Sequence, residues 1–298
     1  MAARLLLAGC VAMVLAVVVP ALGAGEQTAA EAFGEGAKLL EAGDFAGALE
    51  AYTRAAGLEP ENAEYRQQAA LVKRVVAARE LLDEMTDAQR WERTALGLHY
   101  FYHDHKVYGE ALALDRKVHE RLNSPVSAGL LARTCLVMDR NAEAVEVLRG
   151  REDTRTTPEN AVLLGLALVR EGEAEAAKAL LSEMELPETP TAVLLFDSAR
   201  LRAATGDTDG ALKALSQSFE QTPPSRLAAV KAAAGEFPEF AGLVKTDAYA
   251  AALETKSVIQ ESRCSGGAGC GKCPSRTQCS SQQGGEKHPA GCAGEKKP

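Results

Sequence analysis

Residues Ala29–Asn62 read AAEAFGEGAKLLEAGDFAGALEAYTRAAGLEPEN. Apolar and small side chains recur at helical spacing on both sides of Gly43-Asp44, and Pro60 follows the second apolar run. Glycine allows a tight turn, and proline cannot continue a helix. This stretch therefore predicts two short amphipathic helices that pack against each other as a helix-turn-helix unit.

The same unit recurs along the chain. Alanines at the equivalent point of each second helix are separated by 63, 33, 33 and 34 residues: Ala48, Ala111, Ala144, Ala177 and Ala211. Prolines at the joints are separated by 65, 33, 32 and 33 residues: Pro60, Pro125, Pro158, Pro190 and Pro223. Four of these prolines follow a Ser or Thr, which is typical of a helix N-cap before a proline at the first helical position: Ser124, Thr157, Thr189 and Thr222. Two independent markers with one period predict stacked helix pairs, and each of the four prolines is expected to start a helix.

The pattern resembles the tetratricopeptide repeat family, whose helix-turn-helix units of about 34 residues stack into a solenoid. The first repeat carries the pattern at Gly36, Phe45, Ala48, Tyr52, Ala55 and Pro60. The fifth carries it at Gly165, Gly172-Glu173, Ala177, Leu181 and Pro190, and the sixth at Ala199, Gly206-Asp207, Ala211, Leu215 and Pro223. The resemblance implies an all-α, right-handed α-solenoid over residues 25–225. Because the signature residues are the ones that pack, it implies protein binding without indicating the partner.

Residues 1–24 have the features of a secretory signal peptide. Arg4 precedes an apolar run, Leu5–Val19, and small residues follow at positions 21–24. Cleavage there predicts an exported protein, periplasmic or extracellular. Two alternatives place the protein at a membrane: the apolar run is retained as an anchor, or the box Leu7-Ala8-Gly9-Cys10 directs a lipid to Cys10.

The body of the chain is acidic. The net charge is −8; the tail from Lys256 contributes seven Lys/Arg and three Asp/Glu, and Arg4 adds one charge, which leaves −13 for residues 25–255. Such a surface disfavours nucleic acid and anionic membranes as partners after signal cleavage. Aromatic residues make up only 5% of the chain. A single thick core is therefore not expected, whereas a solenoid buries each repeat on its neighbours.

Two parts of the body depart from the repeat. Residues 63–91 predict one long helix, Ala63–Met85, followed by a capping box at Thr86–Gln89, and they are too few for a full repeat, so the helix parity there stays open. Residues 226–255 predict a closing helical segment. Within it, Phe237–Leu243 resembles the short segment that often follows the last repeat of this family and covers its apolar face.

No motif predicts catalysis, and we do not expect an enzyme. His99 and His103 lie one helical turn apart, the spacing at which two imidazoles can share a zinc ion. Two ligands do not complete a site, and His99 falls at a repeat packing position, which favours a partly buried structural histidine. Cys135 lies within a predicted helix and is expected to be a buried, inert thiol.

Residues 256–298 form a tail rich in Gly, Ser, Gln and Lys, which predicts disorder because the segment has little apolar surface to bury. Five cysteines are spread along it: Cys264, Cys270, Cys273, Cys279 and Cys292. No cofactor is predicted elsewhere, and the alternatives here are disulfides or free thiols, zinc, an iron–sulfur cluster, or redox chemistry. The second candidate function is thus a metal-binding or thiol-redox protein whose repeats position this cysteine cluster.

The resemblance also selects a surface for the partner. In this family the first helix of each repeat lines the concave groove, which here selects Phe33, Leu40, Arg93, Leu96, Tyr100, His103, Arg133, Leu136, Val162, Leu166, Arg170, Phe196 and Arg200. Arginine grips carboxylates in two-pronged geometry, so an extended or helical peptide with acidic character is the expected partner. Phe33, Tyr100 and Phe196 are its expected apolar anchors, the alternative being that several arginines only line a solvated rim. The sequence carries no signal for the oligomeric state.

Overall fold

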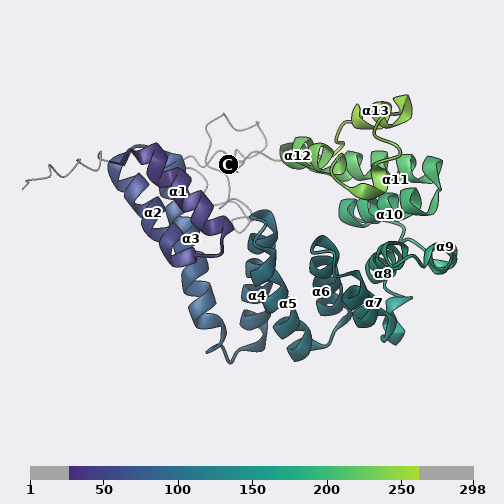
Figure 1. The fold of residues 1–298 in the computed structure, drawn as a ribbon, viewed down its shortest axis with the longest axis horizontal. Coiled ribbons are helices and arrows are strands. Elements are labelled where there is room, and N and C mark those ends of the chain that lie inside the picture. Colours follow the sequence, from purple (N-terminus) through teal and green to yellow (C-terminus); the bar gives the residue numbers. More distant parts are fainter. Residues whose placement is uncertain (1–26, 262–298) are drawn as a thin grey trace, which may run out of the picture. The chain divides into compact units, whose positions relative to one another are not determined.

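A computed structural model describes residues 27–261, so the predicted signal peptide and the five tail cysteines lie outside the described residues. Over this range the chain is all-α, with 13 α-helices, two short 3-10 helices and no strand. Successive helices pack against each other in sequential pairs, as Figure 1 shows. None of the helices in residues 27–261 combines the length and the apolar character that crossing a membrane requires.

The described chain divides into two compact units, which meet in the sequence between Val107 and Tyr108. In the first unit each helix contacts the next one along the chain. Its helices are α1 (Ala29–Glu41), α2 (Phe45–Leu58), α3 (Ala63–Leu82) and α4 (Ala88–Asp104).

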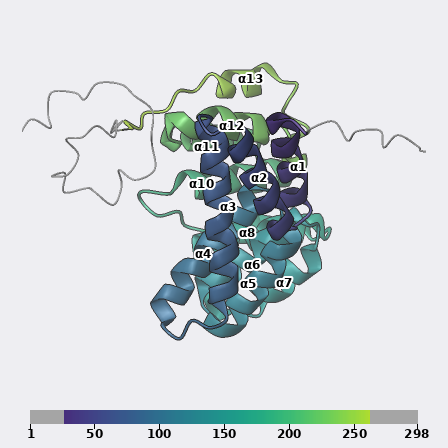
Figure 2. The ribbon, with the colours of Figure 1, turned by 90° about the vertical axis from the view of Figure 1, so that its left-hand side faces the viewer.

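In the second unit α8 contacts both α6 and α10, so the first helices of three consecutive pairs are neighbours. Figures 1 and 2 both show α12 and α13 beyond the α10–α11 pair, on the side away from α8. The elements are α5 (Tyr108–Leu122), α6 (Pro125–Val137), α7 (Asn141–Arg149), η1 (Glu152–Thr154), α8 (Pro158–Arg170), α9 (Ala174–Glu183), α10 (Ala192–Thr205), α11 (Thr208–Gln221), α12 (Pro224–Ala234), η2 (Pro238–Phe240) and α13 (Asp247–Leu253).

The predicted turn between α1 and α2 is confirmed. Gly43 has a φ of 79°, a conformation that costs glycine little, and the Asp44 carboxylate accepts a hydrogen bond of 2.9 Å from the Gly47 amide at the start of α2. The same chemistry joins α10 to α11, where Gly206 has a φ of 91° and Asp207 caps the next helix. Glycine followed by aspartate thus both reverses the chain and starts the second helix.

The alanine marker of the sequence is confirmed as a packing position. All five alanines are fully buried: Ala48, Ala111, Ala144, Ala177 and Ala211. Gly36 is buried against the ring of Tyr52, so α1 and α2 approach closely there. At Gly165 a side chain would meet Leu201, so this glycine lets α8 and α10 approach closely.

The proline marker is confirmed in part. Pro125 starts α6, and its N-cap Ser124 accepts a hydrogen bond from the Ser127 amide. Pro158 likewise starts α8, although the Thr157 side chain makes no capping bond.

The other two proline predictions were wrong. The N-cap of α10 is Thr191, two residues after Thr189, and Pro190 precedes it. Pro223 is itself the N-cap of α12, and Thr222 ends α11. The Thr191 hydroxyl accepts a hydrogen bond from the Leu194 amide, so Thr191 rather than Thr189 is the N-cap of α10.

The irregular stretch 63–91 contains one long helix, α3, which ends at Leu82 rather than Met85. The cap of α4 is Asp87, whose carboxylate accepts from the Arg90 amide at 2.7 Å, so the predicted capping box starting at Thr86 was wrong. Between α2 and α4 the chain therefore forms one helix, α3, which contacts both. This explains why the residue count there is too small for a full repeat.

The closing segment consists of two short helices with η2 between them. It buries Ala234, Phe240, Leu243 and Tyr249 in a core shared with α10 and α11. Beyond α13 the chain returns along α11, where the Val258 amide donates to the Glu220 carbonyl at 2.9 Å. Contacts to the second unit therefore continue past residue 255.

Candidate functional site

Three of the predicted arginines come from neighbouring helices of the second unit. Arg133 lies on α6, Arg170 ends α8 and Arg200 lies on α10. The contacts of α6 with α8 and of α8 with α10 place these three helices side by side (Figure 1). The three arginines are joined through shared carboxylates.

A single carboxylate, that of Glu239 in η2, joins two of these arginines. Arg200 grips it with both prongs: Nε donates to Oε2 and Nη2 donates to Oε1, each at 3.2 Å. Arg170 donates to Oε1 from Nε at 3.0 Å and from Nη2 at 2.7 Å. Only 4% of the Glu239 side chain is exposed, against 7% for Arg200 and 17% for Arg170. We call Arg170 and Arg200 the arginine clamp.

Asp197 extends the network to α6. It accepts from Arg200 Nη1 at 3.1 Å on its own helix and forms an ion pair of 2.7 Å with Arg133 Nη1. Arg170 also donates from Nη1 to the Leu136 carbonyl at 2.7 Å. The chain of contacts thus links α6, α8, α10 and η2, and Arg133, with 30% of its side chain exposed, is its most accessible arginine.

Aromatic rings lie on the Arg200 side of the arginine clamp. The guanidinium carbon of Arg200 lies 4.1 Å from the centre of the Phe237 ring, in cation–π geometry. Phe196 of α10 packs edge-on against Phe237 and Phe240, with ring centres 5.4 and 5.9 Å apart. The site therefore combines cations with an aromatic wall, and the closing segment already contacts both.

The ionisation of Glu239 reflects these partners. Burial alone raises its pKa, but the charges and hydrogen bonds of Arg200 and Arg170 outweigh burial and hold the pKa below the usual 4.5. Glu239 is therefore a carboxylate at neutral pH. The clamp is electrostatically built to hold an anion.

Neither Glu239 nor Asp197 was selected from the sequence as a site residue. Asp197 stands three residues before Arg200, a spacing that places both on one helical face and could have signalled the pair. Glu239 lies 39 residues from Arg200 and 69 from Arg170, so no local pattern could have indicated it.

Four predicted groove residues are buried in the core: Leu40, Leu136, Val162 and Leu166. Their side chains support the helices and present no surface to a partner. Phe196 is partly buried against η2, as described above. In the second unit the accessible part of the predicted surface is therefore polar.

In the first unit the predicted residues are spread over two helices. Phe33 on α1 stacks on Tyr65 with ring centres 4.6 Å apart. On α4, Tyr100 is 60% exposed, Arg93 is exposed, and Leu96 and His103 are partly exposed. These residues remain candidates for partner contact.

The two histidines of α4 lie close together, and His99 is more buried than the sequence suggested. His99 is buried on α4, and its ring centre lies 4.4 Å from that of His103. Cys135 is also buried, and burial raises the pKa of its thiol to about 12. Its thiolate, the reactive form, is therefore negligible at neutral pH.

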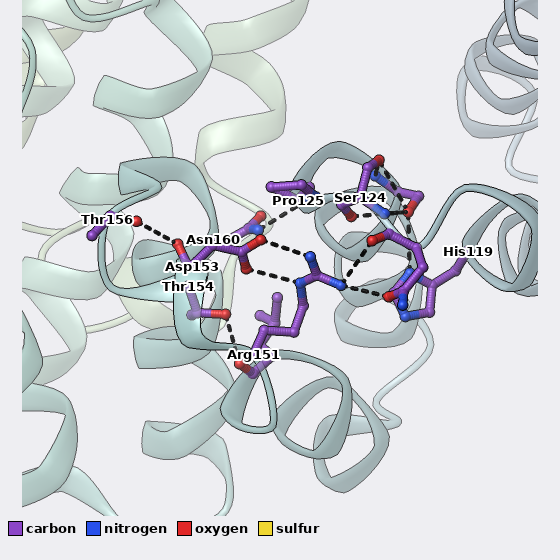
Figure 3. Close-up of polar contacts among 11 residues, drawn as sticks. His119, Ser124, Pro125, Arg151, Asp153, Thr154, Thr156 and Asn160 are labelled. Carbon is purple, nitrogen blue, oxygen red and sulfur yellow. Dashed lines mark hydrogen bonds and ion pairs between the residues drawn. The ribbon is translucent and has the colours of Figure 1, made fainter.

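A second polar cluster lies where the turns of the second unit meet (Figure 3). His119 Nδ1 lies 3.1 Å from Ser127 Oγ, a pairing found in nucleophilic sites. Ser127 is fully buried, however, and its hydroxyl donates to the Ser124 carbonyl at 2.9 Å. The hydroxyl proton is thus used in the cap of α6, and burial together with the charge of Arg151 lowers the pKa of His119. The geometry favours a structural joint.

Arg151 completes this joint. It grips Asp153 with two hydrogen bonds of 2.9 and 2.7 Å and donates to the Asn123 side chain at 2.7 Å, as Figure 3 shows for Asp153. Next to it, a cavity of about 470 Å³ is lined by α7, η1, α8 and α9. The arginines at this cavity each pair with a carboxylate, as with Arg149 and Glu173.

The sequence matches no protein-family model, and a search of curated proteins finds no match. The residues described define the class of protein: an all-helical chain of 13 sequentially packed helices, consistent with a helical repeat.

Proposed function

We propose that this chain is an exported tetratricopeptide-repeat scaffold that binds an acidic protein or peptide partner. The repeat spacing, the buried alanines and the sequential helix pairs support a right-handed solenoid. The leader sequence supports export to the periplasm or the outside of the cell. N-terminal sequencing of the exported protein should find a start near Ala24 or Gly25, and an intact Met1 or a lipid on Cys10 would contradict export in this form.

One observation carries the binding proposal: Arg133, Arg170 and Arg200, from the first helices of three consecutive pairs, all hold carboxylates. Arginine forks match carboxylates in two-pronged geometry. A surface that already selects Glu and Asp from its own chain has the chemistry to select them from a partner.

The experiment is a peptide array of acidic, neutral and basic peptides of equal length, read with the purified mature protein. Acidic peptides should be retained, and Arg133→Ala/Arg170→Ala should weaken their retention. Arg149→Ala/Arg155→Ala is the matched control, because it removes the same charge from two exposed arginines on α7 and the following turn. Equal retention by all three proteins would contradict the proposed surface.

A further inference from the structure

The arginine clamp already holds a ligand that belongs to the chain itself. Residues 237–240, Phe-Pro-Glu-Phe, place Glu239 between Arg170 and Arg200 and the Phe237 ring on the Arg200 guanidinium. The contact therefore joins the closing segment to the very residues that the sequence selected for a partner. It also shows which chemistry this surface accepts.

We propose that the arginine clamp is the binding site for an acidic residue flanked by aromatic residues in a peptide partner, and that Glu239 fills the site until the partner's carboxylate replaces it. This inference rests on the proposed function and adds to it the partner's recognition chemistry and a closed state. Phe196 supplies the wall for the aromatic flanks, since it packs on both Phe237 and Phe240.

Replacement by a carboxylate follows from the burial of the clamp. Arg200 and Arg170 are largely removed from water, and a buried cation left without its counter-ion is strongly destabilising. When Glu239 moves away, a neutral or basic peptide would leave Arg200 with Asp197 as its remaining counter-ion, and Arg170 with the Leu136 carbonyl and the exposed Asp139. A peptide with its own carboxylate replaces the ion pairs of Glu239 with equivalent ones. The clamp therefore favours acidic peptides over neutral or basic ones when the closing segment leaves it.

The closing segment is attached in a way that permits this exchange. In the described part of the chain, the backbone hydrogen bonds of residues 235–246 outside the helices run only to residues 232–250, and none reaches α8 or α10. Side chains hold the segment: Glu239 by ion pairs, Phe237 and Phe240 by ring packing, and Phe240 and Leu243 also by burial in the core shared with α10 and α11. A partner that supplies an acidic residue between aromatic residues replaces the contacts that Glu239, Phe237 and Phe240 make at the clamp.

The experiment uses the segment itself as the probe. A fluorescent peptide with the sequence of residues 234–246, AGEFPEFAGLVKT, is titrated against the wild-type mature protein, Glu239→Gln and the control Glu236→Gln. Glu236 is exposed on the same segment, so its replacement removes the same charge outside the clamp. Glu239→Gln should bind the peptide at least tenfold more tightly than the wild type, and Glu236→Gln should bind like the wild type. A second peptide with Gln at the position of Glu239 should bind Glu239→Gln at least tenfold more weakly.

A second measurement needs no variant. Hydrogen exchange of the wild-type protein is followed by mass spectrometry with saturating isotope-labelled peptide, and exchange in residues 235–246 should rise as the segment leaves the clamp. Unchanged exchange in this segment would overturn the inference.

The outcomes separate the inference from the proposed function. Equal, Glu-selective binding to wild type and Glu239→Gln would overturn the closed state and leave the acidic-peptide function standing. Equal binding of the Glu and Gln peptides would overturn the clamp as the site. Absence of binding to all three proteins would overturn both the inference and the proposed function.

Discussion

Replacing Glu239 tests the arginine clamp through stability. Breaking a buried ion pair by removing one partner costs about 3–5 kcal/mol, because the remaining charge is buried without compensation. Here Arg200 keeps Asp197, and Arg170 keeps the Leu136 carbonyl. The cost of Glu239→Ala should therefore lie at the lower end of this range, a loss of about 3 kcal/mol in the free energy of unfolding. Glu239→Gln, which retains a neutral acceptor, should cost about 2 kcal/mol.

The assay is urea denaturation of the mature protein at pH 7, followed by far-UV circular dichroism. Glu236→Ala on the same segment is the control and should change the free energy of unfolding by no more than about 0.5 kcal/mol, because its side chain is exposed. A loss for Glu239→Ala no larger than that of the control would refute the reasoning.

The pH dependence gives an independent check. The native pKa of Glu239 lies below 4.5, so the unfolded state binds more protons and stability falls as the pH falls. The stabilisation should be fully present above about pH 4.5 and be lost as the pH falls through the native pKa. The stability difference between wild type and Glu239→Gln should accordingly shrink on acidification below this pH, and a constant difference would contradict the assignment.

Three further predictions test the packing, the thiol and the tail. Gly34→Ala should raise the free energy of unfolding by up to about 1 kcal/mol, because space is open there and alanine favours a helix, whereas Gly36→Ala should lower it by about 1–3 kcal/mol by pushing against the Tyr52 ring. Differential scanning calorimetry of both variants tests this difference, and equal shifts of the melting temperature would contradict it. Cys135 should stay unmodified by iodoacetamide in the native protein at pH 8 and react fully in urea, since burial raises its pKa to about 12. Peptide mass mapping measures the modification, and labelling of Cys135 in the native protein would contradict its burial. Removal of all residues after Glu261 should leave the melting temperature nearly unchanged, and a large loss would mean that the tail stabilises the helices.

Much of the fold follows from local spacing in the sequence. The 33-residue separation of Ala111 and Ala144 is enough to place both in helix pairs, because a helix pair needs a small residue where its backbones approach. Gly43-Asp44 likewise predicts its turn, since glycine allows the positive φ and aspartate caps the next helix. Where two hydroxyls compete for a cap, as Thr189 and Thr191 do, spacing alone selected the wrong one.

The tertiary structure alone decided what the arginines hold. Periodicity places Arg170 and Arg200 on successive first helices, because that property depends only on neighbours within one or two turns. Their shared partner, Glu239, is 69 and 39 residues away, and it reaches them only after α10, α11 and α12 have packed and returned the chain to α8. Helix packing and the need of two buried guanidiniums for a counter-ion determine an ion pair between such distant residues. Local sequence spacing determines neither.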